Sequence, residues 1–291
     1  MVAKQMIEEE RYEDALEFIN KAIDVYPSAE SHYLRALICY ELQSNYNQVI
    51  ESSQLCIEHR YKIKESYELL AFATFNLERY QETIKAADEC LRIDRRNMVA
   101  NYYKARALSQ LGRNQEAKTT YLEIVKYDGI VEYGLYYYVY NNLAYMYLKE
   151  GDFENATKYI KESIKCTHLY GNAWDTYGEI MYKQEKYNEC IEYMNRAIQL
   201  GIEGTEHWLD NSYYFRGMSY KALGYDLDAY NDLSVAVSLK NEDAQKVLDS
   251  EFNDNNGKSC KFSTMYKTPM FSSSSNGLTL QAVETTDECT I

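Results

Sequence analysis

A small or compact residue recurs along this chain at a step of 34 residues, and this period limits the fold more than any other feature. The positions are Ala15, Val49, Thr83, Ala117, Ala156, Cys190 and Ala229. Their spacings are 34, 34, 34, 39, 34 and 39, so both exceptions exceed the period by five residues. Apolar residues recur between them at three- and four-residue steps, which is typical of amphipathic helices. The period therefore predicts a helical hairpin that is copied along the chain.

Two segments carry a second pattern, in which a small residue follows a large one by four positions and precedes another by three. They are Trp174, Gly178 and Met181, and Tyr213, Gly217 and Tyr220. The pattern resembles the tetratricopeptide repeat, a 34-residue helix–turn–helix unit. The resemblance covers about residues 1–243 and implies an all-α, right-handed superhelical solenoid of about seven hairpins.

The register divides the chain into a repeat domain, 1–252, and a tail, 253–291. The repeats are 1–29 (partial), 30–63, 64–97, 98–131, 137–170, 171–204 and 210–243, with insertions at 132–136 and 205–209. Residues 242–252 carry apolar side chains at helical spacing and predict a C-terminal capping helix.

Several small residues have a predicted packing role. Gly178 and Gly217 mark close approaches of the two helices of a hairpin, where a large side chain would clash. Glycines 112, 151 and 224 end first helices, because glycine adopts the left-handed conformation at low cost. Asp152 is placed to cap the helix that follows, and cysteines 56, 90 and 190 are expected to be buried substitutes for alanine.

The tail is expected to be flexible, apart from a strand-like stretch at 278–283 for which the sequence offers no partner strand. A lone strand and a clipped first repeat lead to the hypothesis that the chain is a fragment of a larger protein.

Acidic residues outnumber basic ones, 45 to 31, and the formal net charge is −14. This balance argues against nucleic acid and anionic membranes, which both require a basic surface. No apolar stretch approaches the roughly 18–20 residues that span a bilayer, and residues 1–8 lack the apolar core of a secretory signal. Seven cysteines without a CxxC pair suit a reducing compartment, so we expect a cytoplasmic protein.

No catalytic motif is present in the sequence, which lacks GxxxxGK[ST], GxGxxG and HExxH. The four histidines fall in different repeats without the spacing of metal ligands. We therefore predict a protein without enzymatic activity, metal or cofactor.

The resemblance implies that the first helices line a concave groove that binds partners. The groove residues that it nominates are Phe72, Phe75, Tyr102, Arg106, Tyr138, Asn141, Asn142, Tyr145, Tyr182 and Tyr214. Aromatic side chains are natural anchors, the asparagines can hold a ligand backbone, and Arg106 can meet a carboxylate or phosphate. The alternative interpretation is that about half of the aromatic residues pack against the neighbouring repeat. The tyrosine-rich run at 133–140 is interpreted mainly as packing, with the first insertion lengthening the adjacent first helix.

Some relatives grip the C-terminal carboxylate of chaperones with lysine at the fifth place of a repeat. The complete repeats here carry Leu34, Glu68, Tyr102, Asn141, Asp175 and Tyr214 at that place. None is a lysine, so this sequence predicts no such clamp.

The sequence thus predicts a non-catalytic scaffold that binds a peptide or protein, basic or neutral in charge, in its groove. The alternative is a regulatory or adaptor arm of a larger multidomain enzyme or envelope protein.

Overall fold

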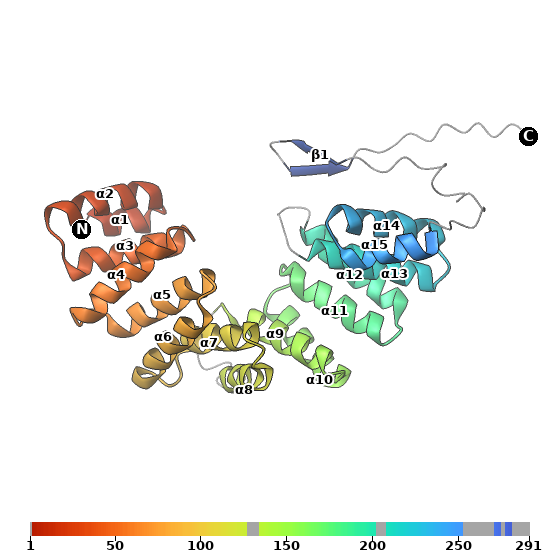
Figure 1. Ribbon diagram of the computed structural model, residues 1–291, viewed down its shortest axis with the longest axis horizontal. Helices are drawn as coiled ribbons and strands as arrows, with labels where there is room; N and C mark the ends of the chain where they lie inside the picture. The colour runs from red at the N-terminus through yellow and green to blue at the C-terminus, as the bar shows by residue number, and fades with distance from the viewer. Residues whose placement is uncertain (1, 127–133, 202–207, 253–270, 275–276, 281–291) are drawn as a thin grey trace, which may run out of the picture. The chain divides into compact units, whose positions relative to one another are not determined.

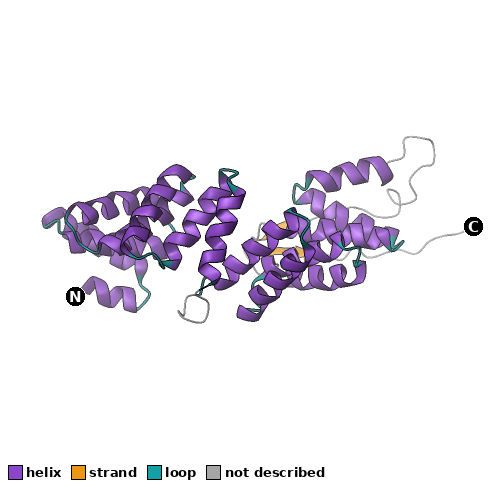
Figure 2. Ribbon diagram, turned by 90° about the horizontal axis from the view of Figure 1, so that it is seen from below, coloured by secondary structure: helices purple, strands orange, loops and turns teal. Residues whose placement is uncertain are grey.

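Figures 1 and 2 show the computed structural model, which describes residues 2–126, 134–201, 208–252, 271–274 and 277–280. These residues form helices, short connections and one small β-hairpin (Figure 2). They fall into two compact units, Met1–Val139 and Tyr140–Ile291, and we describe each by itself.

Unit 1 consists of helical hairpins in chain order. Its helices are α1 (Val2–Glu8), α2 (Tyr12–Val25), α3 (Ala29–Glu41), α4 (Tyr46–Glu58), α5 (Ile63–Asn76), α6 (Tyr80–Ile93), α7 (Met98–Gln110) and α8 (Asn114–Val125). The boundary between the units falls within α9 (Tyr136–Lys149).

Unit 2 continues the same order. Its helices are α10 (Phe153–Cys166), α11 (Gly171–Lys183), α12 (Tyr187–Gly201), α13 (Leu209–Ala222), α14 (Asp226–Ser238) and α15 (Glu242–Val247), followed by a π-helical turn, η1 (Leu248–Phe252). The strands are β1 (Phe271–Ser274) and β2 (Gly277–Leu280).

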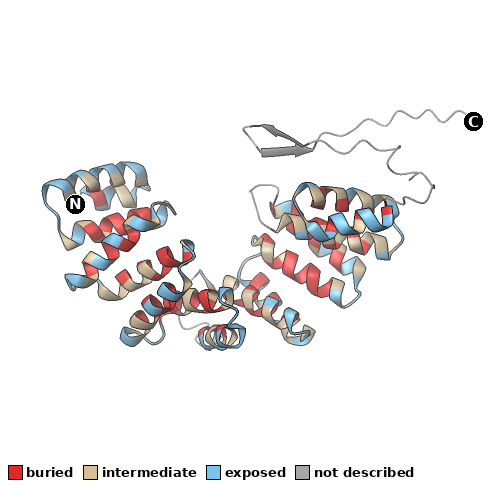
Figure 3. Ribbon diagram, viewed as in Figure 1, coloured by how far each residue is buried: buried red, intermediate tan, exposed pale blue. Residues whose placement is uncertain are grey.

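The helices pack as the period predicts. Consecutive helices pack against each other from α1 to α8 and from α10 to α15. First helices of neighbouring hairpins also touch, as α1 and α3, α3 and α5, and α5 and α7 do in unit 1, and α11 and α13 in unit 2. Buried residues gather where helices of one unit face each other (Figure 3). The predicted all-α stack of hairpins is confirmed.

The residues that define the period are fully buried in the stack. All seven, from Ala15 to Ala229, have exposed fractions of 0%. A Cβ on Gly178 would lie 2.6 Å from Cε of Met194 on α12, so only glycine fits there without a shift of that side chain. The cysteines at 56, 90 and 190 are also buried, in agreement with their predicted packing role.

The turn inside every hairpin uses one left-handed residue, two positions after the first helix ends. These residues are Glu10, Gln43, Glu78, Gly112, Gly151, Glu185 and Gly224, with φ between 45° and 81°. The three predicted glycines are confirmed, and four hairpins hold the same conformation with a glutamate or glutamine. A side chain in this conformation costs roughly 1–2 kcal/mol, so the fold imposes it where the sequence lacks glycine.

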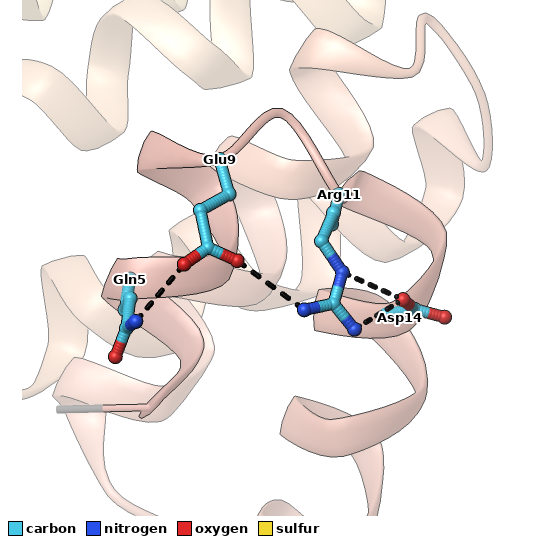
Figure 4. A network of polar contacts seen from close by, with 4 residues as sticks. All are labelled: Gln5, Glu9, Arg11 and Asp14. Carbon is cyan, nitrogen blue, oxygen red and sulfur yellow. Dashed lines mark hydrogen bonds and ion pairs between the residues drawn. The ribbon is translucent and has the colours of Figure 1, made fainter.

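Polar side chains fix the helix starts locally. Asp152 caps α10 as predicted, since its Oδ1 accepts from the backbone N–H of Asn155 at 3.0 Å. At the turn of the first hairpin, Arg11 bonds to Glu9, just after α1, at 3.2 Å and to Asp14 of α2 at 2.8 and 3.0 Å (Figure 4). These groups are exposed, so we assign the network a small contribution to stability.

The capping helix is confirmed over Glu242–Phe252, although its second half is π-helical. Ala244, Leu248 and Phe252 are buried in one cluster with Leu233 and Ala236 of α14. The stack in unit 2 is thereby closed by apolar contacts at its C-terminal end.

Two expectations are wrong. The first insertion does not lengthen the adjacent first helix, because α9 has 14 residues, as α5 and α13 have. The strand-like stretch is not alone, because Phe271–Ser274 pairs antiparallel with Gly277–Leu280. The expected flexibility of the remaining tail lies outside the described residues.

Candidate partner-binding surface

We use the term first-helix surface for the ten residues that the sequence nominates as groove residues. Five are half-buried, namely Arg106, Tyr138, Asn142, Tyr182 and Tyr214. Tyr145 is 44% exposed. The other four, Phe72, Phe75, Tyr102 and Asn141, are only 4–8% exposed. The expectation that all of them face solvent is therefore wrong for these four.

Rings of adjacent first helices pack together in unit 1 and bury the aromatic residues among the four. Tyr103, which the sequence analysis did not nominate, lies at the centre of this cluster. Its ring centroid is 5.9 Å from Phe72, 5.8 Å from Phe75 and 5.3 Å from Tyr102. Burial raises the pKa of the Tyr103 hydroxyl. The packing interpretation is therefore confirmed for Phe72, Phe75 and Tyr102.

Arg106 lies on top of this ring cluster. Its guanidinium carbon is 4.1 Å from the ring centroid of Phe75 and 5.4 Å from that of Tyr102, which is cation–π geometry. Burial raises the pKa of the Tyr102 hydroxyl, and the charge of Arg106 and a hydrogen bond from Arg106 oppose this rise. Tyr138 flanks the same ring, with centroids 6.2 Å apart. Within the described residues Arg106 makes no ion pair.

The other buried or half-buried arginines have polar acceptors. Arg35 bonds to Ser52 at 2.8 Å and to Glu51 at 3.1 Å. Arg216 holds both carboxylate oxygens of Asp232 at 2.7 Å, and Arg196 donates to the Gln199 amide at 2.7 Å. Arg216 also lies near a ring, with its guanidinium carbon 5.3 Å from the Tyr213 centroid. Within the described residues, Arg106 therefore differs from these three in having aromatic rings but no carboxylate or amide acceptor.

Unit 2 presents a different set of side chains at the corresponding places. Tyr145 lies beneath the ammonium of Lys149, which is 4.7 Å from the ring centroid. The same ammonium is 3.1 Å from the carboxylate of Glu179 on α11, whose side chain is 5% exposed. Lys149 is not among the groove residues that the sequence predicts. A signal was available, because Lys149 follows Tyr145 by four residues and so shares its helix face.

Asp175, one turn before Glu179 on α11, is a fully buried carboxyl group. Burial raises its pKa to about 8, and the 2.6 Å hydrogen bond with Ser212 of α13 only partly offsets this. The charges that act on it, Glu179 and Asp210, are also acidic. A carboxyl group in this setting is mostly protonated at neutral pH. Its Oδ1 accepts a hydrogen bond from the Ser212 hydroxyl.

Tyr182 and Tyr214 meet through a ring that was not nominated. Phe215, which is 8% exposed, lies 5.2 Å from Tyr182 and 5.1 Å from Tyr214 by ring centroids. The two tyrosines are therefore held by a buried neighbour while part of each remains accessible.

The two nominated asparagines separate in the structure. Asn141 is 4% exposed, and its Oδ1 has no hydrogen-bond partner within the described part of the chain. Asn142 is half-buried. Only Asn142 is therefore open enough to meet a ligand backbone directly.

Clefts also lie elsewhere in the described part of the chain, and the three named next are not lined by a nominated residue. One, of about 530 Å³, is bordered by Tyr177 and Tyr193, whose rings stack at 4.1 Å, and by Lys161 and Lys186. A second, of about 360 Å³, lies beside Trp174. The third, of about 200 Å³, lies in unit 1 beside Tyr67.

Across the described ranges, no group of three or more His, Cys, Asp or Glu side chains is placed to hold a metal ion. In the same ranges, no helix is both long and apolar enough to cross a membrane. The surface offers aromatic rings, amides and single charges, which are suited to binding rather than to bond making.

Comparison with known proteins places these features among helical repeats. The model of one family, described as the tetratricopeptide repeat, matches residues 100–129 and 137–165. The Hsp70-Hsp90 organising protein of Plasmodium falciparum (isolate 3D7) is 26% identical over 171 residues. That match covers 55% of this chain but 28% of the relative, so the chain spans little more than a quarter of that protein.

Solved structures share the fold at low sequence identity. PilW, described as a widely conserved type IV pilus biogenesis factor, has a TM-score of 0.63 at 17% identity, and the match covers 76% of this chain and 98% of PilW. A tetratricopeptide repeat protein from Parabacteroides merdae ATCC 43184 has a TM-score of 0.60 at 12% identity, over 85% of this chain and 94% of that one.

Proposed function

Because this chain is a tetratricopeptide repeat protein, we propose that it is a non-catalytic scaffold that binds a peptide or protein partner on its first-helix surface. One observation carries the proposal. Three accessible members of this surface rest on buried rings: Arg106 on Phe75 and Tyr102, and Tyr182 and Tyr214 on Phe215.

Side chains held in this way are suited to binding. An accessible residue fixed by its neighbours loses little conformational entropy when a partner covers it, so more of the contact energy remains for affinity. Tyrosine and arginine are also the residues that most often dominate the binding energy of interfaces. The four buried nominees then serve as support, while Arg106, Tyr138, Asn142, Tyr145, Tyr182 and Tyr214 make the contacts.

The partner is proposed to be basic or neutral overall, because a chain with a net charge of −14 repels a strongly acidic protein at long range. The name of the curated relative links that protein to two chaperones. The absence of lysine from the fifth places argues against the chaperone-tail clamp, and the buried state of Asn141 and Asp175 at two of those places adds to that argument.

Binding of short peptides tests the proposal directly. A displayed peptide library is selected on the immobilised full chain, and the winners are measured by fluorescence anisotropy. Replacement of Tyr145 and Tyr182 by serine is expected to weaken binding by about tenfold or more. The matched control is Tyr225→Ser, which removes a more exposed tyrosine (56%) from the residue just before α14. The proposal would be contradicted if the wild-type chain, the double variant and the control bound the peptides with equal affinity. It would also be contradicted if the control lost as much affinity as the double variant.

A second candidate function, an adaptor or regulatory arm of a larger protein, is favoured by the fraction of the curated relative that is matched, 28%. Sequencing of the full transcript tests it. A reading frame that continues into a further domain supports this candidate, and a frame that encodes only these residues excludes it.

A further inference from the structure

We propose that Arg106 binds the side-chain carboxylate of an aspartate or glutamate in the partner peptide. This inference rests on the proposed function and names the chemistry of one of its contacts. The site consists of Arg106 on α7, the supporting rings of Phe75 and Tyr102, and the flanking ring of Tyr138.

Arg106 hydrogen-bonds with the Tyr102 hydroxyl and makes no ion pair in the described residues, so most of its donors remain available. A guanidinium is planar, and its five N–H groups point outward in the plane from its edge. Aromatic rings occupy the faces, with Phe75 only 4.1 Å from the guanidinium carbon. The edge can therefore take a carboxylate in a two-bond contact, while the rings hold the plane in a fixed orientation.

The counter-ion of Arg106 is missing from the described residues, although the chain is rich in acid. Acidic residues number 45 against 31 basic ones. Arg35 and Arg216 both have a carboxylate partner on the second helix of their own hairpin. The corresponding second helix of the Arg106 hairpin, α8, contributes Tyr121 to the ring cluster, 6.5 Å from Tyr102. A half-buried cation without a counter-ion is stabilised when a partner supplies a carboxylate, because the new ion pair offsets the cost of burying the charge.

A carboxylate fits this site better than a phosphate does. A phosphate group carries close to two negative charges at neutral pH and is usually held by more than one cation. The second basic residue of α7, Lys104, is already paired with Asp88 of α6 at 2.6 Å. The basic residue of α5, Lys64, lies 4.0 Å from Asp94. Arg106 thus offers a single positive charge, which matches a single carboxylate.

This contact is compatible with a partner that is basic or neutral overall. Long-range attraction depends on net charge, whereas a hydrogen-bonded ion pair depends on the groups in contact. The inference therefore specifies one acidic residue within the bound peptide and leaves the partner's net charge unchanged.

A double-mutant cycle on the full chain tests the inference. Peptides selected as above are made with blocked ends, so that only side-chain carboxylates are available. We expect the selected peptides to carry an aspartate or glutamate. Its replacement by the matching amide should weaken binding to the wild-type chain by about tenfold, but by less than about twofold when the chain carries Arg106→Gln.

Charge and folding are controlled separately. Arg113→Gln removes one positive charge from an exposed arginine between α7 and α8, whose partner is Glu116 at 2.7 Å. It should leave the peptide preference unchanged, because it alters net charge and not the site. Arg106→Lys keeps the charge but loses the planar donor edge, so we expect an intermediate affinity. Circular dichroism of each variant checks that the helices remain folded.

Three results would overturn the inference: selected peptides without an acidic residue, an equal loss on wild-type and Arg106→Gln chains, or a gain from a phosphorylated residue or a free C-terminal carboxylate over the side-chain carboxylate. If no peptide binds at all, the proposed function fails on its own. Carboxylate binding at Arg106 is then tested by NMR. The chemical shift of the Arg106 Nε–Hε signal should change on titration with N-acetylglutamate amide and should not change with N-acetylglutamine amide. Equal responses would overturn the inference.

Discussion

The hairpin α7–α8 in unit 1 and the hairpin α11–α12 in unit 2 hold different chemistry at the same places of the repeat. The fifth place is Tyr102 in one and Asp175 in the other, and each is 5% exposed. Tyr102 is buried among rings, whereas Asp175 is buried as a carboxyl group with one hydrogen bond to Ser212. The place in the repeat determines burial, and the residue type determines what that burial costs.

The ninth place of the repeat carries opposite charges in the two hairpins, Arg106 in α7 and Glu179 in α11. Arg106 lies half-buried on aromatic faces without an ion pair in the described residues. Glu179 is 4% exposed and is paired with Lys149 of the preceding first helix. The charge of Glu179 is thus neutralised within unit 2, whereas Arg106 has no counter-ion in the described residues. Four substitutions test this comparison.

The largest effect is expected from Asp175→Asn. The wild-type carboxyl has a pKa of about 8 in the folded chain and about 3.9 when unfolded. As pH rises above 4, the unfolded state loses the proton first, so wild-type stability falls until pH 8 and then levels. The variant should be more stable by about 4 kcal/mol at pH 7 and equal to wild type at pH 4.

Urea unfolding followed by tryptophan fluorescence measures this difference, because both tryptophans, Trp174 and Trp208, lie in unit 2. The matched control is Asp226→Asn, at an exposed position of α14. A stability difference between wild type and Asp175→Asn that stays constant from pH 4 to pH 9 would contradict the buried, protonated state of Asp175.

Tyr102→Ala tests the other fifth place. Removal of a buried ring leaves a cavity and is expected to destabilise unit 1 by about 3 kcal/mol. Hydrogen exchange of the α5 and α7 amides reports this loss, since the tryptophans report unit 2 alone. Tyr26→Ala, at a site that is 76% exposed, is the control and should change little. Slow exchange that persists in Tyr102→Ala would show that the ring is not part of the core.

Lys149→Met tests the ninth place of unit 2. The substitution leaves the buried Glu179 carboxylate without its cation, and we expect a loss of about 1 kcal/mol, because the lysine is itself half exposed. Adding Glu179→Gln should restore stability. Lys165→Met, which breaks the exposed pair with Glu162, is the control. A double variant that is weaker than the single one would show that the glutamate is needed for another reason.

Glu185→Gly should give the smallest effect, a gain of roughly 0.5–1 kcal/mol in unit 2. Glu185 has φ of +59°, whereas Gly112 holds the same turn in the compared hairpin at +73°. The reverse substitution, Gly112→Glu, should destabilise unit 1 by a similar amount. Tryptophan fluorescence measures the stability of unit 2, and hydrogen exchange measures that of unit 1. A loss of stability in Glu185→Gly would mean that the Glu185 side chain makes a contact that outweighs the backbone strain.

Much of the fold was predictable because it depends on local spacing. The small residues from Ala15 to Ala229 mark positions where helices approach closely, and their step alone gave the hairpins. Asp152 and Gly151 signalled a turn through their intrinsic backbone and capping preferences. The partner of the strand at 277–280 was missed, since Phe271–Ser274 is a serine-rich stretch without clear alternation.

The candidate site was less predictable, because exposure depends on neighbours that are distant in sequence. Phe72 and Phe75 occupy places that generally face a groove, yet Tyr103 of the next hairpin covers them. Lys149 reaches Glu179 across 30 residues, and the length of its side chain allows this contact. Neither result follows from the angular position of a residue on its own helix.

The sequence by itself determined the hairpins, their turns, the buried row of small residues and the capping helix, because each follows from periodicity and local conformational preference. Only the tertiary structure decided that Arg106 rests on aromatic faces without an ion pair in the described residues, and that Asp175 is buried with one serine for a partner. Such outcomes are set by the side chains of adjoining hairpins, which together fix the volume, the solvent access and the counter-charges around each group.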